Sequence, residues 1–344
     1  QIQPRPDHSI RIPRPDLSAK VKAPDACTQC HKGKTPAWAA EAMVRWYGPI
    51  RRQGPHFGEA FALARGGEPK GYEALAALVA NRSMPPIVRA SAMAALRPDP
   101  LTGAEARIAA TRDPDPEVRA AAADSLEGLN APERVTALGP LLSVRVRAVR
   151  LPAARALSSA PAEQMEATLR PRFDAALAEY IAAQEVSLDM PGAQFNLAIV
   201  YENTGRRDQA ERHYLGALRI DPDFTPARAN LAQLYAASAR NGDAERVLVE
   251  GLKRLPDLGE LQYSLGLLLA EDPNRMKESA EALGRASKLL PTRPDVHYNL
   301  GLALEVLGQN APAERAMLQA QQLNPTDPRI AYALAIFYSK TGRN

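Results

Sequence analysis

The sequence predicts an all-α protein, a helical-repeat solenoid preceded by a small N-terminal segment. Two internal periods indicate the repeats: one of 30 to 31 residues from about residue 70, and one of 34 residues in the C-terminal half. The composition agrees, because aromatic residues are scarce at 5% and small residues are abundant, which favours closely packed helices. We therefore divide the chain into residues 1–69, 70–168 and 169–344.

The first 25 residues contain five prolines, and no helical period survives them. Proline fixes φ and restricts the residue before it. We therefore expect an extended, loop-like arm that lies against other parts of the protein. The chain begins at Gln1 instead of a methionine, and we expect it to be a processed or trimmed chain.

The first period is marked by three similar segments, VRASAMAAL (88–96), VRAAAADSL (118–126) and VRLPAARAL (149–157). Their starts are separated by 30 and 31 residues, and an Asp-Pro turn precedes the second, where proline is tolerated in a first helical turn. This pattern resembles HEAT-like repeats, pairs of helices whose second member begins at the Val-Arg step. We expect three such units over residues 70–168. We interpret the carboxylates of the turn as helix caps, namely Asp113, Asp115 and Glu117.

The second period resembles the tetratricopeptide pattern, with leucine and a small residue at positions 7 and 8 of each unit. Tyrosine or leucine follows at position 11, small residues at 20 and 27, and proline at 32. Small residues let paired helices approach closely, and the proline sets the turn to the next unit. Residues 173–188 resemble the second helix of a diverged unit, and DPRIAYALAIFYSKTG the first helix of a fifth. Four units lie between them: residues 191–224, 225–258, 259–293 with one inserted residue, and 294–327.

The only two cysteines, Cys27 and Cys30, are followed directly by His31. A thioredoxin-like dithiol belongs to a strand–helix alternation that is missing here, and a structural zinc site needs four ligands. A small disulfide leaves His31 unexplained. Attachment of haem c uses all three residues, with two thioethers and an imidazole bound to iron. We predict one covalent haem c per chain, with Cys27 and Cys30 as anchors and His31 as proximal axial ligand; zinc binding and redox chemistry are the alternatives.

The order of motifs resembles the C-terminal part of multihaem c-type cytochromes fused to tetratricopeptide repeats. The segments that carry this resemblance are DHSIRIPRPDLS, PDACTQCH, WAAEAMVRWYGP and HFGEAFALAR, followed by the two kinds of repeat. That family has further Cys-x-x-Cys-His motifs upstream, and this chain has none. The resemblance therefore implies either the tail of a larger cytochrome or a single-haem relative.

The sixth iron ligand is to be found among the remaining histidines. His56 follows the motif by 25 residues and opens a helix, so we favour it as the distal ligand. His8, on the proline-rich arm, is the alternative; by analogy with multihaem cytochromes it would ligate a neighbouring haem, including one of another subunit. Met43 or an open position are the other options. We interpret His213 and His297, inside tetratricopeptide helices, as surface or groove residues.

Five of the eighteen aromatic residues fall within 24 positions after the cysteines. We interpret them as a low-dielectric wall around the porphyrin, with a small protein core as the alternative. The candidates are Trp38, Trp46, Tyr47, Phe57 and Phe61. The same region is locally basic, which suits haem propionates, an acidic redox partner or a solvated surface. Its basic residues are Lys32, Lys34, Arg45, Arg51 and Arg52.

Other classes of function find little support in the sequence. The formal net charge is only +4, and basic runs with interleaved aromatics are missing from the repeats, so we expect no nucleic-acid partner. No apolar run reaches the length of a membrane span. Glycine-rich phosphate loops, nucleophile elbows and His-Glu metal helices are also missing. We therefore lean against an enzyme.

The favoured function is electron transfer by haem c, with the concave face of the solenoid holding partners. Covalent haem attachment and the export it requires predict a periplasmic or extracellular, cell-surface location. Expected partners are a redox protein or other haem-bearing subunits, with a homo-oligomer or polymer as an assembled form. One alternative is the scaffold portion of a multihaem oxidoreductase acting on small nitrogen or sulfur compounds. Another is an assembly module in which haem is a covalent staple.

Overall fold

A computed structural model of the protein describes residues 13–49, 56–96 and 102–342. Every regular element in these ranges is a helix, which confirms the predicted all-α solenoid. The chain divides into an N-terminal unit, residues 1–183, and a C-terminal unit, residues 184–344. No helix in the described ranges is both long and apolar enough for a membrane crossing.

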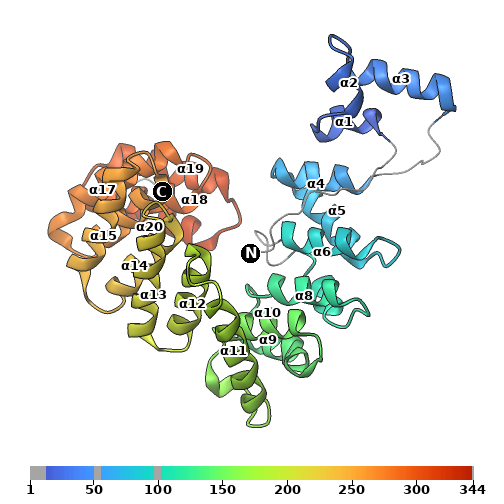
Figure 1. The fold of residues 1–344 in the computed structure, drawn as a ribbon. Helices are drawn as coiled ribbons and strands as arrows, with labels where there is room; N and C mark the ends of the chain where they lie inside the picture. The colour runs from blue at the N-terminus through green and yellow to red at the C-terminus, as the bar shows by residue number, and fades with distance from the viewer. Residues whose placement is uncertain (1–12, 50–55, 97–101, 343–344) are drawn as a thin grey trace. The chain divides into compact units, whose positions relative to one another are not determined.

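The N-terminal unit consists of short helices in which α4, α5, α6, α8 and α10 follow one another in space as they do in the chain (Figure 1). Its helices are α1 (Pro15–Val21), α2 (Ala26–Cys30), α3 (Pro36–Tyr47), α4 (Phe57–Arg65), α5 (Pro69–Ala80), α6 (Pro86–Ala95), α7 (Ala104–Ala110), α8 (Pro116–Ser125), α9 (Ala131–Leu138), the 3-10 helix η1 (Gly139–Ser143), α10 (Arg147–Leu157), η2 (Ala162–Gln164) and α11 (Arg170–Glu185), which reaches into the C-terminal unit.

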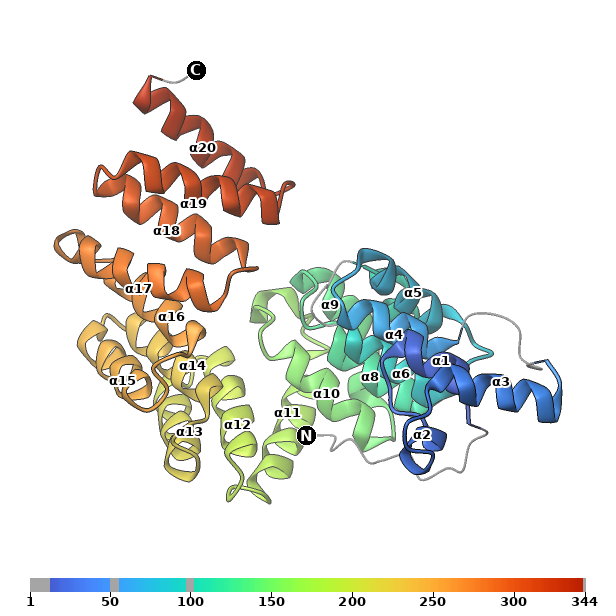
Figure 2. The ribbon, with the colours of Figure 1, turned by 90° about the horizontal axis from the view of Figure 1, so that it is seen from above.

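The C-terminal unit is a series of antiparallel helix pairs, and each helix packs on the helices before and after it (Figure 2). Its helices are α12 (Pro191–Asn203), α13 (Arg207–Ile220), α14 (Thr225–Ala236), α15 (Asn241–Arg254), α16 (Gly259–Leu269), η3 (Pro273–Arg275), α17 (Met276–Leu289), α18 (Pro294–Val306), α19 (Asn310–Leu323) and α20 (Pro328–Thr341).

The proline-rich arm is not extended over the part that the structure describes, and this prediction is wrong there. Pro15 is the first residue of α1, where its missing N–H costs nothing because that group has no partner inside a helix. Leu17 is buried, and α1 packs against α3 and α4. Proline thus starts a helix that anchors the motif segment to the repeats.

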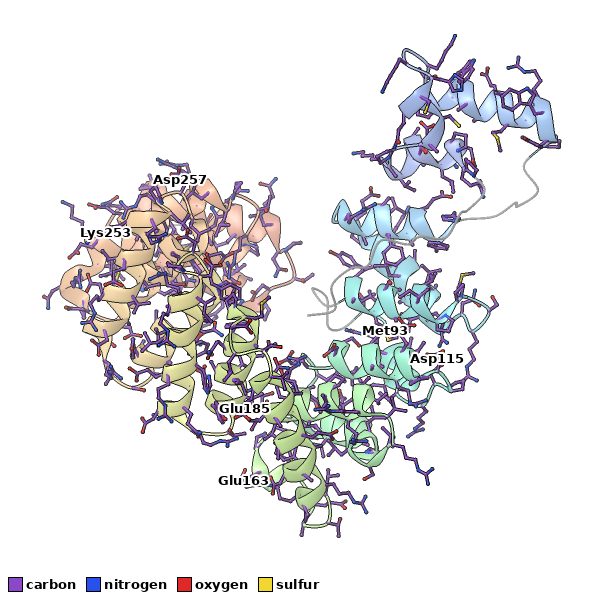
Figure 3. All side chains as sticks on the ribbon, viewed as in Figure 1. Met93, Asp115, Glu163, Glu185, Lys253 and Asp257 are labelled. Atoms are coloured by element: carbon purple, nitrogen blue, oxygen red, sulfur yellow. The ribbon has the colours of Figure 1, made fainter. Side chains whose placement is uncertain are left out.

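The Val-Arg segments of the N-terminal unit lie in α6, α8 and α10, as predicted, although each helix begins two residues before the valine. Val88, Val118 and Val149 are buried. Met93, labelled in Figure 3, is fully buried in the core that α6 shares with α5 and α8. Asp115, also labelled there, caps α8 by accepting the Glu117 N–H at 2.8 Å.

Two of the three arginines of these segments bind the turn that precedes their own helix. Arg119 donates to the carbonyls of Asp113 and Pro114, directly before its own helix, at 2.6 and 2.9 Å. Arg150 makes the equivalent bonds to the carbonyls of Val144 and Arg145 at 2.6 and 2.9 Å. In α8 and α10 the Val-Arg step therefore combines a buried valine with an arginine that holds the preceding turn.

The small residues of the tetratricopeptide pattern lie where two helices meet. A Cβ on Gly266 would come within 2.6 Å of Leu283 Cγ, and one on Gly301 within 2.6 Å of Met317 Cγ. Ala198 and Ala232, at the same position of the first two units, are buried. The packing reason given for this pattern is therefore confirmed.

Candidate functional site

Cys27, Cys30 and His31 lie on one short capped turn of the N-terminal unit. The Asp25 carboxylate accepts the N–H groups of Cys27 and Thr28 on Oδ1 at 2.9 and 3.1 Å. The Thr28 hydroxyl donates to its other oxygen at 2.6 Å, and these hydrogen bonds, with the hydroxyl foremost, lower the pKa of Asp25. The His31 N–H donates to the Cys27 carbonyl at 2.9 Å and closes the turn.

The reactive groups of this turn are accessible. Both thiols are free; Cys27 is half-buried and Cys30 is exposed, and their spacing of three residues places them on the same side of α2. The imidazole of His31, also exposed, lies against Trp38 with ring centroids 5.1 Å apart. The Lys34 ammonium is 5.5 Å from the centroid of the same Trp38 ring.

These residues fit a covalently bound haem c. Two free thiols lie on the same side of a helical turn, and an exposed imidazole follows directly in the chain. Among the described residues, no three His, Cys, Asp or Glu side chains are gathered as metal ligands. When bound, haem c supplies a one-electron iron couple.

The aromatic residues of α3 lie at its two ends. Trp38 contacts His31, whereas Trp46 and Tyr47 form an edge-to-face pair, with ring centroids 6.4 Å apart, at the other end of the helix. At 1.5 Å per residue, Trp46 lies about 12 Å further along the axis than Trp38. Trp46 and Tyr47 are 67% and 70% exposed. Trp38 is thus the aromatic neighbour of the motif, and a wall role for Trp46 and Tyr47 stays a prediction.

His56 is the N-cap residue of α4. Its Nδ1 accepts the Gly58 N–H at 3.1 Å, and Glu59 accepts the His56 N–H at 3.2 Å, which forms a capping box. Neutral imidazole with Nδ1 as acceptor carries its proton on Nε2. Iron binding through Nε2 would therefore require a change of tautomer and the loss of this cap bond.

Other predicted residues of this region take different places. The ring of Phe57 lies beside that of His56, with centroids 4.1 Å apart, while Phe61 packs against the core of the N-terminal repeats. Met43 is half-buried on α3. Lys32, Lys34 and Arg45 are exposed. Three predicted residues lie outside the described ranges: His8, Arg51 and Arg52.

The two histidines of the C-terminal unit make contacts within the solenoid. His213 pairs through Nδ1 with Oε1 of Gln194 at 2.7 Å and stacks on Tyr201, with centroids 5.2 Å apart. Burial, followed by the nearby charge of Arg212, lowers the pKa of His213. His297 bonds through Nε2 to the Pro291 carbonyl at 2.9 Å. We interpret both as structural residues of the repeat.

His297 belongs to a hydrogen bond that recurs in four units. At position 4 of each unit, a side-chain nitrogen reaches the carbonyl six residues earlier, in the turn from the preceding unit. The distances are 2.9, 2.7, 3.4 and 2.9 Å. The bonds run from Gln194 to Leu188, Arg228 to Pro222, Gln262 to Pro256 and His297 to Pro291.

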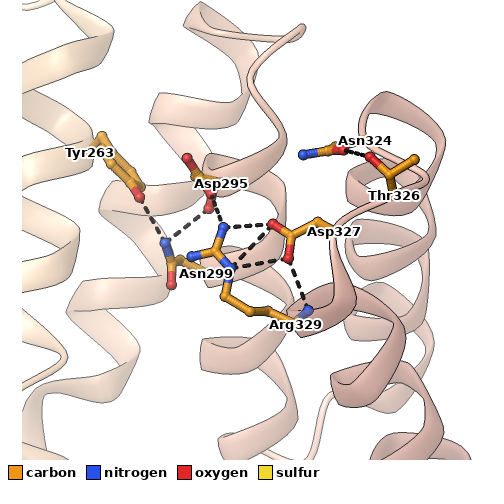
Figure 4. Close-up of polar contacts among 7 residues, drawn as sticks. All are labelled: Tyr263, Asp295, Asn299, Asn324, Thr326, Asp327 and Arg329. Carbon is orange, nitrogen blue, oxygen red and sulfur yellow. Dashed lines mark hydrogen bonds and ion pairs between the residues drawn. The ribbon is translucent and has the colours of Figure 1, made fainter. Parts of the chain in front are cut away.

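Ion pairs also link successive units of the C-terminal solenoid. Arg240 pairs with Glu211 at 2.7 Å, and Arg275 with Glu245 at 2.6 Å. Figure 4 shows a further link, in which Arg329 of α20 contacts Asp327 at 2.6 Å and Asp295 of α18 at 3.2 Å. In the same view, Asn299 donates to the Tyr263 hydroxyl of α16 at 2.8 Å. Polar side chains therefore cross-link neighbouring units in two ways: from a turn inside one unit to the second helix of the unit before it, and between first helices.

Comparison with known families identifies the repeats of the C-terminal unit. Family profiles described as Tetratricopeptide repeat match residues 191–224 and 294–327, the first and fourth units predicted from the sequence. The fold thus defines a helical-repeat scaffold, and the chain contains tetratricopeptide repeats, which serve protein–protein interaction. No curated protein matches the chain.

Solved structures to which parts of this chain are similar include MamA and two proteins described as TPR proteins. In the crystal structure of MamA, the matched region is 22% identical in sequence and covers 44% of this chain and 83% of the MamA chain, with a TM-score of 0.40. A thermophilic TPR protein of Thermus thermophilus is 19% identical, with 49% and 92% covered and a TM-score of 0.40. YrrB, described as a TPR protein with an unusual peptide-binding site, is 18% identical, with 54% and 91% covered and a TM-score of 0.39.

Proposed function

We propose that this protein carries one covalent haem c for electron transfer and uses its repeats as a scaffold for protein partners. The single observation that carries the haem proposal is the capped turn at residues 25–31. It offers two free thiols on one side and an exposed imidazole, as haem c requires. Cys27 and Cys30 would hold the porphyrin edge through sulfur, and His31 would bind the iron.

The neighbouring residues support this proposal by setting the surroundings of the imidazole. Trp38 excludes water from one side of His31, and a drier environment changes the potential of a bound iron. Lys32 and Lys34 are exposed directly after the motif and suit propionate groups or an acidic redox protein.

The scaffold part of the proposal rests on the tetratricopeptide repeats. Stacked repeats build long surfaces to which other proteins bind. We propose a redox protein or haem-bearing subunits as partners, in homo-oligomers or polymers as well as mixed assemblies. Attachment of haem c occurs on exported chains, and we therefore propose a periplasmic or cell-surface location.

An absorption spectrum with a pyridine haemochrome assay on the purified full chain tests the proposal. The expected result is a c-type spectrum with one haem per chain that survives denaturation. The double variant Cys27→Ala/Cys30→Ala is the matched control and should retain the helical fold without covalent haem. A wild-type chain without haem, made in cells that mature c-type cytochromes, would refute the proposed function.

A further inference from the structure

Asp25 is engaged entirely with the motif that follows it. The residue is only 6% exposed, although the preceding residues 22–24 are exposed. Both carboxylate oxygens accept hydrogen bonds, two from backbone N–H groups of Cys27 and Thr28 and one from the Thr28 hydroxyl. Three hydrogen bonds to a buried carboxylate therefore hold Asp25 in place within an otherwise exposed segment.

Asp25 is connected to His31 through hydrogen bonds of the backbone. Asp25 holds the N–H of Cys27, and the carbonyl of Cys27 accepts the N–H of His31. Trp38 then lies against the imidazole itself. One continuous set of contacts therefore runs from the Asp25 carboxylate through the first cysteine to the proximal ligand.

We propose that Asp25 is a positioning residue for the attachment of haem c to Cys27 and Cys30; this inference rests on the proposed function. Each thiol sulfur forms a bond to one carbon of a vinyl group, the thiol hydrogen ends on the other carbon, and the C=C π bond is lost. No electrons leave the reacting groups, so no oxidant is needed. What the protein must supply is two thiols that are presented together.

The cap is needed because α2 is very short. A helix of five residues has no intrinsic stability in water, and its first N–H groups lack partners inside the helix. Asp25 supplies partners for two of them. Without the cap, the turn opens and the two thiols no longer share one side, so the second thioether forms less readily than the first.

The test compares three variants of the full chain made in cells that mature c-type cytochromes. Asp25→Ala removes the cap, and Asp25→Asn keeps an oxygen that can accept both N–H groups. Asp115→Ala is the matched control, because it removes an aspartate cap from α8, far along the chain from the motif. The measurements are covalent haem per chain and the pyridine haemochrome band, which shifts to longer wavelength when one vinyl group remains unreacted.

We expect Asp25→Ala to lose covalent haem severalfold and to shift the band, while Asp25→Asn and Asp115→Ala match the wild type. Thr28→Val, which removes one of the three hydrogen bonds, should give a smaller loss and serves if Asp25→Ala does not accumulate. Equal haem and an unshifted band in both Asp25→Ala and Thr28→Val would overturn the role of Asp25 alone. Absence of haem from the wild type would instead overturn the proposed function and this inference together.

Discussion

The Arg89 guanidinium lies 2.7 Å from the Asp113 carboxylate, and the two side chains are only 7% and 2% exposed. Arg89 also donates through Nε to the Val79 carbonyl at 3.0 Å, and Asp113 accepts the Asp115 N–H at 3.0 Å. The pair thus joins α6 to the turn that precedes α8. Charges buried in this way are costly when one partner is removed.

Arg89→Ala should destabilise the N-terminal unit by about 3–5 kcal/mol, because it leaves the Asp113 carboxylate buried without its partner. Urea denaturation followed by far-UV circular dichroism measures the change. Arg170→Ala is the control: Arg170 makes an exposed pair with Asp174, and its loss should cost less than about 0.5 kcal/mol. Equal effects of the two substitutions would contradict the structural assignment of the buried pair.

The same pair predicts a loss of stability in acid. Burial alone would raise the pKa of Asp113, but hydrogen bonds from Arg89 and from the Asp115 N–H outweigh it and hold the pKa below its ordinary 3.8. A carboxyl group with a depressed folded pKa stabilises the protein above its unfolded pKa and loses this contribution as the pH falls through the folded value. Urea midpoints between about pH 5 and pH 2 should therefore fall less steeply for Asp113→Asn than for the wild type. Parallel curves would argue against this role of Asp113.

Two glycines of neighbouring helices should respond to alanine with opposite signs. Gly266→Ala places a Cβ 2.6 Å from Leu283 Cγ and should cost about 1–3 kcal/mol. Gly284 in α17 has no atom within 4 Å of the equivalent Cβ, so Gly284→Ala should stabilise the helix by about 0.5–1 kcal/mol. Thermal denaturation of the two variants measures both effects, and a neutral Gly266→Ala would show that α16 and α17 can separate without cost.

His297→Gln should leave stability unchanged, because glutamine performs the same role at Gln194 and Gln262. His297→Ala should cost about 1 kcal/mol through the lost hydrogen bond to Pro291. Denaturation curves test both expectations. The haem spectrum of His297→Gln is the second measurement: it should equal that of the wild type, and a change would assign this histidine to a ligand role instead.

His56→Asn separates capping from iron binding. Asparagine is a good N-cap residue, so α4 should keep its stability. Because Nδ1 of His56 is used by the cap in the structure, we expect the haem spectrum of this variant to equal that of the wild type. Conversion to a high-spin spectrum at unchanged thermal stability would show the opposite, that His56 supplies the sixth ligand.

The repeats could be predicted from the sequence because they depend on local spacing. Small residues at positions 8, 20 and 27 recur with the period of the unit, and Gly266 and Gly301 pack as that pattern implies. Helix α1 was not predicted, because five prolines in 25 residues indicated an extended arm. Proline is nevertheless favoured as the first residue of a helix, and Pro15 takes that position. The pair of Arg89 and Asp113 could not be predicted, since the two residues are 24 positions apart with no pattern that links them.

The residues of the motif could be predicted from the sequence, but the contact of Trp38 with His31 could not. Cys27, Cys30 and His31 are adjacent in the sequence, whereas Trp38 reaches His31 only because α3 packs on α2. The Asp25 cap did have a sequence signal, an aspartate three residues before a threonine. The position-4 hydrogen bonds had one as well, because glutamine, arginine and histidine all carry side-chain N–H donors there.

The position-4 hydrogen bonds determine where the C-terminal solenoid tolerates a change of length. Each spans the same six residues across the junction between two units, so an insertion there would separate donor from acceptor. The turn inside a unit has no hydrogen bond of this kind; its links to the preceding unit are ion pairs of long arginine side chains, those of Arg240 and Arg275. The extra length of the third unit lies in such a turn, at η3 between α16 and α17. Insertions into the C-terminal solenoid should therefore destabilise it less within units than between them.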